Sequence, residues 1–134
     1  MKRSSVQDSV KFGFSLIEVM IVVVIIGILA TLAYPRLERY LISSRQTEAK
    51  TNLMAIHTAQ KIYHSSNRKY ADSLNELGVE VPQGDNAQYG YTLETDGNFF
   101  MVTATGNIDS DETKDVWTIN QDKKLINVEN DVTN

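Results

Sequence analysis

Cysteine is absent from the 134 residues of the chain, and histidine occurs only twice. Without cysteine no disulfide can hold a domain together, and thiol chemistry and cysteine–zinc sites are excluded. His57 and His64 are seven residues apart. That is about 10 Å along a helix, too far to ligate one metal ion. The glycines form no phosphate-binding loop or dinucleotide fingerprint, and no serine has a G-x-S-x-G context, so the sequence gives enzyme activity little support.

An apolar run from Phe14 to Tyr34 contains a single carboxylate, Glu18. Its 21 residues would form a helix of roughly 32 Å, enough to cross the hydrocarbon core of a bilayer. A charged side chain inside such a span costs about 2.5 to 3.5 kcal/mol, so it is normally retained for a function and has a partner. The span itself offers Glu18 no partner, which makes this residue a candidate for function.

A secretory signal peptide is the first alternative, because Lys2, Arg3 and Lys11 form a basic start before the apolar run. The run is longer than the usual 7 to 15 residues, and no A-x-A cleavage site ends it. A plain signal anchor for an unrelated domain is a second alternative. Such an anchor would need neither Gly13 beside Phe14 nor Glu18 in the bilayer.

The residues Gly13-Phe14-Ser15-Leu16-Ile17-Glu18 resemble the N-terminal signature of type IV prepilins and the related pseudopilins, and Gly27 and Pro35 also match that pattern. The resemblance implies that a prepilin peptidase cuts after Gly13 and methylates the new N-terminal Phe14. It implies that Glu18 pairs with the free amine of a neighbouring subunit during assembly. It also implies that the helix near Gly27 and Pro35 can lose its structure in a filament.

The same resemblance implies an organisation into a leader (residues 1–13), a transmembrane and filament-core helix (14–34) and a head outside the cytoplasm (35–134). Implied partners are further copies of the chain, prepilin peptidase, an inner-membrane assembly platform and minor pilins. The chain would lie in the inner membrane before assembly and in an extracellular pilus afterwards, serving adhesion, motility or DNA uptake. A pseudopilin of a type II secretion or competence system shares every N-terminal feature and is the alternative. A single-span anchored binding module is the second alternative.

The rest of the chain predicts an α+β fold. Proline at position 35 favours a kink, but apolar positions continue at helical spacing to a helix end near residues 65–67. This stripe suits packing against a sheet and consists of Leu37, Tyr40, Leu41, Ala49, Leu53, Ile56, Ala59, Gln60 and Tyr63. Four strands are predicted at residues 89–95, 98–105, 116–120 and 124–128, with hairpin turns at 96–97 and 120–123. We expect one long N-terminal helix packed on a four-stranded, largely antiparallel sheet, with Tyr70, Leu74 and Leu77 covering the seam between them.

Charge is divided unevenly along this fold. Residues 35–69 carry seven Lys or Arg and two Glu, whereas residues 70–134 carry three Lys and thirteen acids. Such asymmetry bears on association, so it indicates either attraction between the head of one subunit and the helix of another or simply two solvated surfaces.

An acidic loop at residues 109–115 is the remaining candidate site. Asp109, Asp111 and Asp115 supply the hard oxygen ligands that calcium takes, although the loop lacks the glycine and distal glutamate of an EF-hand. A solvated polar turn is the alternative. Many type IV pilins close their C-terminal region with a disulfide and some pseudopilins order it with calcium, so the resemblance keeps calcium as the one possible cofactor.

Overall fold

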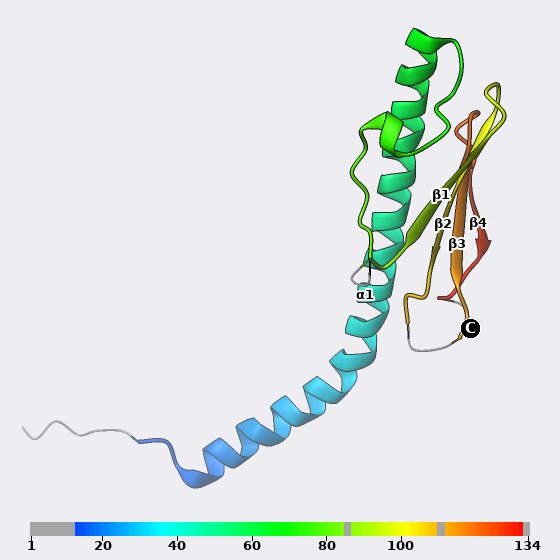
Figure 1. The fold of residues 1–134 in the computed structure, drawn as a ribbon. Helices are drawn as coiled ribbons and strands as arrows, with labels where there is room; N and C mark the ends of the chain where they lie inside the picture. Colours follow the sequence, from blue (N-terminus) through cyan, green and yellow to red (C-terminus); the bar gives the residue numbers. More distant parts are fainter. Residues whose placement is uncertain (1–12, 85–86, 110–111, 133–134) are drawn as a thin grey trace, which may run out of the picture. The chain divides into compact units, whose positions relative to one another are not determined.

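The computed structural model describes residues 13–84, 87–109 and 112–132 (Figure 1). Helix α1 (Leu16–Asn67) is followed by the short 3-10 helix η1 (Asn75–Leu77) and by strands β1 (Gly90–Thr95), β2 (Phe100–Gly106), β3 (Asp115–Asn120) and β4 (Leu125–Glu129). The chain divides into two compact units, one ending at Leu37 and the other beginning at Glu38, and each is described by itself. The predicted α+β class is confirmed, with each strand beginning and ending within two residues of its predicted bounds.

The four strands form one antiparallel sheet in the order β1-β2-β3-β4 (Figure 1). The turn between β1 and β2 contains Gly97 at φ 88°, a left-handed conformation that glycine adopts without steric cost. The turn between β3 and β4 is held by Asn120, whose side-chain oxygen accepts bonds from the backbone N–H groups of Asp122 and Lys124. Both turns lie where the sequence predicted them.

The core lies between the sheet and the part of α1 that begins at Glu38. In β2 the buried residues alternate as a strand with one covered face requires, and Phe100, Val102 and Ala104 face the core. Leu53 and Ile56 of α1 are fully buried in the same cluster. Burying side chains of this size stabilises the fold by about 1.5 to 3 kcal/mol each.

The segment after α1 is fastened to the helix by a buried amide. Gln60 donates from Nε2 to the carbonyl of Ala71 at 3.0 Å and accepts from its N–H at 2.9 Å, so both backbone groups are satisfied. Tyr70 packs edge-on against Phe100 with ring centroids 4.7 Å apart. Leu74 and Leu77 pack partly buried against the core, so the predicted cover of the seam is confirmed.

The apolar stripe of the helix is only partly covered. Its residues from Ala49 to Gln60 include the buried ones, whereas Leu37, Tyr40 and Leu41 are exposed by 56%, 72% and 49%. The expectation that the whole stripe packs on the sheet is wrong for these three residues, because the buried cluster of α1 begins only at Ala49. Such exposure of large apolar side chains indicates a surface that another molecule covers.

Candidate functional site

The N-terminal signature lies at the start of α1. Gly13, Phe14 and Ser15 precede the helix, and Phe14 is 88% exposed. A Cβ placed on Gly13 would meet nothing within 4 Å, so the fold of the subunit itself does not require glycine there. Residues 1–12 of the predicted leader, including Lys2, Arg3 and Lys11, lie outside the described residues.

Glu18 caps its own helix. Because α1 begins at Leu16, Ser15 is the N-cap and Glu18 the third helical residue, and the backbone N–H of Ser15 donates to Glu18 Oε2 at 2.7 Å. This is one half of the capping box S-x-x-E, in which the glutamate reaches back to the N-cap. The expectation that the span offers Glu18 no partner is therefore wrong. The S-x-x-E spacing in residues 15–18 is the signal that would have revealed the cap.

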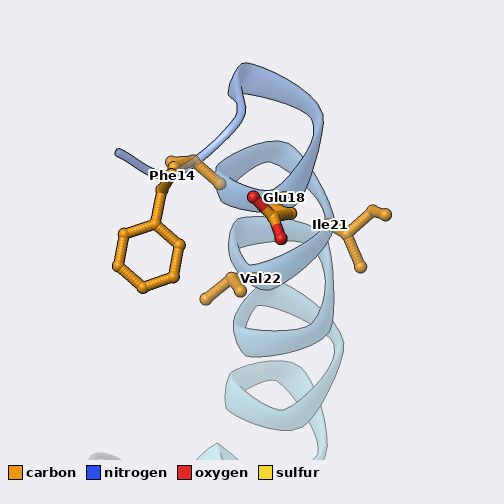
Figure 2. A pocket seen from close by; sticks show the side chains of 5 residues that line it. Phe14, Glu18, Ile21 and Val22 are labelled. Carbon is orange, nitrogen blue, oxygen red and sulfur yellow. The ribbon is translucent and has the colours of Figure 1, made fainter. Parts of the chain in front are cut away.

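The carboxylate of Glu18 lies on an otherwise apolar helix face. Figure 2 shows it between the side chains of Phe14 and Ile21, with Val22 further along the helix. Together with Val19 these residues line an open hollow of about 480 Å³. The large apolar side chains of residues 14–34 are all exposed, by 49% to 88%. Glu18 is thus the one charged side chain on an exposed apolar surface.

Helix α1 is the one helix, among the described residues, that is long and apolar enough to cross a membrane. It continues through both Gly27 and Pro35. Thr31 Oγ1 donates to the carbonyl of Gly27 at 2.8 Å, and Pro35 has no N–H for the carbonyl of Thr31 four residues earlier. The bonding around residues 27–35 is therefore irregular although the helix is unbroken. Loss of helix there in a filament stays a prediction.

The acidic loop leads into a buried carboxylate. Asp111 lies outside the described residues, Asp109 is partly buried, and Asp115, the first residue of β3, is fully buried. Asp115 Oδ2 accepts bonds from the hydroxyl of Tyr89 at 2.5 Å and the indole N–H of Trp117 at 2.6 Å. Burial first, and then the bond to Asp115, raise the pKa of Tyr89, which keeps its hydroxyl protonated as a donor.

The other oxygen of Asp115 joins distant parts of the chain. Oδ1 accepts from the side-chain amides of Gln46 at 3.0 Å and Asn127 at 3.1 Å and from the backbone N–H of Asp131 at 3.3 Å. Five donors from the helix, the segment before β1, the sheet and the C-terminal segment thus converge on one carboxylate. A calcium ion at Asp115 would have to replace these donors, so the donor set fits a hydrogen-bonded hub better than a metal ligand.

Three further contacts extend this hub. Asp131, itself buried, accepts a bond from the backbone N–H of Ile108 at 3.1 Å, and Arg45 donates to the Ile108 carbonyl. The ammonium of Lys50 lies 4.3 Å from the centre of the Trp117 ring. Sequence reasoning missed this network because bonded members such as Gln46 and Asp115 are 69 residues apart and no local pattern connects them.

Two family profiles match the chain. The prokaryotic N-terminal methylation motif matches residues 9–34, which include Gly13, Phe14 and Glu18. The profile of the type IV pilin-like G and H proteins matches residues 46–123, more than half of the chain. The chain belongs to this type IV pilin-like family. The resemblance to type IV pilins and pseudopilins is thereby confirmed, both in the N-terminal helix and in the head.

Curated relatives include both pilins and secretion proteins. The chain is 51% identical to the type IV major pilin of Myxococcus xanthus over 81 residues, which cover 60% of this chain and 36% of that protein. It is 32% identical to a type IV major pilin of Neisseria gonorrhoeae over 98 residues, 73% of this chain and 59% of that protein. Identity to the type II secretion system core protein G of Aeromonas hydrophila is 40% over 69 residues, 52% and 48% of the two chains. The chain thus spans between about a third and three fifths of the length of these relatives.

Proposed function

We propose that this chain is the structural subunit of a type IV pilus, made as a membrane-anchored precursor, cut after Gly13 and polymerised into a helical filament. The observation that carries the proposal is Glu18, a single carboxylate beside Phe14 on an exposed apolar helix in a chain that matches the methylation motif. In this account the chemistry is assembly rather than catalysis. Before assembly the chain lies in the inner membrane, and afterwards in an extracellular filament.

Each part of the N-terminal helix has a role in the proposed assembly. Cleavage frees the amine of Phe14, and its ammonium on one subunit pairs with Glu18 on the next. Exposed apolar residues from Leu16 to Leu41 then pack against neighbouring helices instead of lipid. Glu18 can keep its bond to the Ser15 N–H on one oxygen and offer the other to the neighbour, because a carboxylate has lone pairs for several donors.

A pseudopilin of a type II secretion system is the second candidate. The 40% identity to a core protein G of such a system, and the matching family profile of G and H proteins, favour it. Surface material sheared from the producing cell separates the two. For a pilus subunit, filaments should contain this chain with an N-methylated Phe14 at its start. Absence of the chain from surface filaments, with a processed form retained in the cell envelope, would favour the pseudopilus.

The remaining partners follow from the proposed pathway. A prepilin peptidase would cut and methylate the precursor, and an assembly platform in the inner membrane would add subunits to the base of the filament. Minor pilins would join the same polymer. An N-terminus beginning at a residue other than Phe14 in mature protein would contradict the proposed processing.

Calcium binding by the acidic loop is proposed as a secondary property, with Asp109 and Asp111 as ligands and Asp115 as the hub that anchors the loop. A ligand selective for the folded state raises stability by mass action. A soluble fragment from about residue 36 should then melt higher in millimolar calcium than in chelator. An unchanged midpoint, or an equal rise after Asp109→Ala with Asp111→Ala, would leave the loop as a solvated turn.

A further inference from the structure

An open hollow of about 450 Å³ lies on the head, where the turn between β1 and β2 lies near the end of β3. Its lining includes Glu94 of β1, Phe99, Met101 of β2 and Asn120 of β3. Phe99 and Met101 are exposed by 59% and 45%. An aromatic ring and a thioether are therefore open to solvent directly beside a carboxylate.

Glu94 lies on the face of the sheet that points away from the core. It pairs across the strands with the exposed Met101, whereas its neighbour Leu93 pairs with the buried Val102. Within the described residues the side chain of Glu94 makes no hydrogen bond or ion pair. Asp96, also at the hollow, is engaged differently, because its carboxylate accepts the backbone N–H groups of Asn98 and Phe99. Glu94 is thus the carboxylate at this hollow with both oxygens open to a partner, whereas Oδ1 of Asp96 is engaged.

The chemistry of the hollow suits an arginine side chain. A guanidinium can pair with a carboxylate while it lies on an aromatic ring, and its aliphatic stem can cover a neighbouring apolar group. Here Glu94, Phe99 and Met101 would supply these three contacts. The chain already uses cation–ring contacts internally, where the Lys50 ammonium lies over the Trp117 ring and the Lys61 ammonium over the Tyr70 ring.

Charge complementarity identifies the partner as a second copy of the chain. Residues 35–69, of which α1 contains those up to Asn67, carry seven basic residues against two acids, whereas residues 70–134 carry thirteen acids against three Lys. Arg36 and Arg39 are exposed, and neither makes an ion pair in the part of the chain that the structure describes. A contact of the acidic head with itself would bring like charges together. A contact of the head with the basic helix of the next copy joins two different surfaces, the arrangement that generates open helical filaments.

We propose that the hollow at Glu94 and Phe99 receives Arg36 or Arg39 of a neighbouring copy in the filament. The proposal rests on the proposed function, because the filament supplies the neighbour. Together with the contact at Glu18, this contact in the head would fix how neighbouring subunits are aligned. Since exposed ion pairs are individually weak, its main effect is to favour one packing of heads over others.

Cross-linking tests the contact directly, because the chain has no cysteine of its own. Filaments are assembled in the producing cell from full-length chain with Glu94→Cys and Arg39→Cys, or with Glu94→Cys and Arg36→Cys, and treated with a short bis-maleimide. At least one pair should give a ladder of covalent multimers in denaturing gels, and each single substitution should not. Glu80→Cys with the same arginine substitutions is the matched control. Intact filaments without a ladder from either pair would overturn the proposal and leave the pilus assignment intact.

Charge reversal gives an independent test with a different readout. Glu94→Arg should lower filament yield severalfold, whereas Glu80→Arg, an exposed acid outside the hollow, should not. Adding Arg39→Glu or Arg36→Glu to Glu94→Arg should restore yield. An unchanged melting midpoint of the Glu94→Arg head is expected, since the side chain has no partner there. Normal yield with Glu94→Arg, or loss that neither reversal restores, would overturn the proposal. If the unaltered chain forms no filaments at all, the proposed function itself fails.

Discussion

At the N-terminus of α1, the carboxylate of Glu18 has two oxygens and needs only one of them for the helix cap. Oε2 accepts the backbone N–H of Ser15, which is an amide before and after cleavage at Gly13. In the proposed maturation the cap therefore persists, and the charge stays available to a neighbouring subunit. A glutamine at this position could keep the cap, because capping boxes use Glu or Gln, but it would carry no charge.

Gly13 is predicted to be required for maturation and not for folding. Because a Cβ at Gly13 meets nothing within 4 Å in the subunit, Gly13→Val should leave the helix and head intact. A side chain at the cut should obstruct the close backbone approach of the peptidase, so the precursor should insert in the membrane and stay uncut. Mass spectrometry of the membrane fraction measures the outcome. A normal N-methylated Phe14 in this variant would reject the role of Gly13.

Asp115 is predicted to be the most sensitive polar residue of the head. Asp115→Ala removes the acceptor for five donors, and each buried donor left unpaired costs about 1 to 3 kcal/mol. We expect a loss of at least about 3 kcal/mol in the free energy of unfolding, measured with urea on a head fragment from about residue 36. Asp115→Asn should lose less, because its amide oxygen still accepts.

An exposed aspartate provides the control for this prediction. Asp122 lies in the turn between β3 and β4, and its side chain accepts one bond, from Gln121. Asp122→Asn should change the free energy of unfolding by no more than about 0.5 kcal/mol. Equal losses for the Asp115 and Asp122 variants would contradict the role of Asp115 as a hub.

Among the secondary-structure elements, the hairpin of β1 and β2 gives a prediction about pH. Hydrogen bonds from the backbone N–H of Phe99 and then of Asn98 lower the pKa of Asp96 from its ordinary value of 3.8. The ionised form is therefore favoured in the folded state. Its contribution to stability is fully present above the unfolded pKa and is lost as pH falls through the lowered folded pKa.

The comparison of the unaltered head with Asp96→Ala isolates this contribution. The difference in their free energies of unfolding should be constant from neutral pH down to about pH 5 and should shrink below pH 3.8. Urea unfolding at a series of pH values measures it. A difference that grows as pH falls would show that the turn does not hold the carboxylate in its ionised form.

The elements of the fold could be predicted from sequence because each has a local signal. Alternation of apolar residues marks β2, Asp96-Gly97 marks its preceding turn, and spacing of three and four marks the buried face of α1. Because the strands pair in the order in which they occur in the chain, each connection joins two neighbouring antiparallel strands. The exposure of Leu37, Tyr40 and Leu41 could not be predicted this way. Periodicity indicates which face of a helix is apolar, but not how much of that face the sheet buries.

The candidate site was predictable to a lesser degree. Gly13, Phe14 and Glu18 lie in one short motif, so the sequence alone could predict them as site residues, and their roles stay predictions. The role of Asp115 was not predictable, since Gln46 lies 69 residues away and a carboxylate in an acidic loop looks like a ligand for cations. Only the fold brings its five donors together.

For the whole molecule, the head contains no disulfide, and hydrogen bonds to a buried carboxylate connect its elements instead. The Asp115 hub joins α1 at Gln46, β3 at Trp117, β4 at Asn127 and the C-terminal segment at Asp131. The hub therefore connects the elements that a disulfide could otherwise connect. This closure does not depend on the redox state of the surroundings.

The central claim, that the charge of Glu18 drives polymerisation of the processed chain, is tested most directly by counting filaments made by Glu18→Gln expressed as the only copy. This variant keeps an acceptor for the Ser15 N–H and removes a charge from the membrane span, so it should insert and be cut after Gly13 as the unaltered chain is. N-terminal sequencing of the membrane fraction checks that step. The account predicts a processed Phe14 together with a collapse in the number of filaments per cell in electron micrographs. Normal numbers of filaments from Glu18→Gln would contradict it.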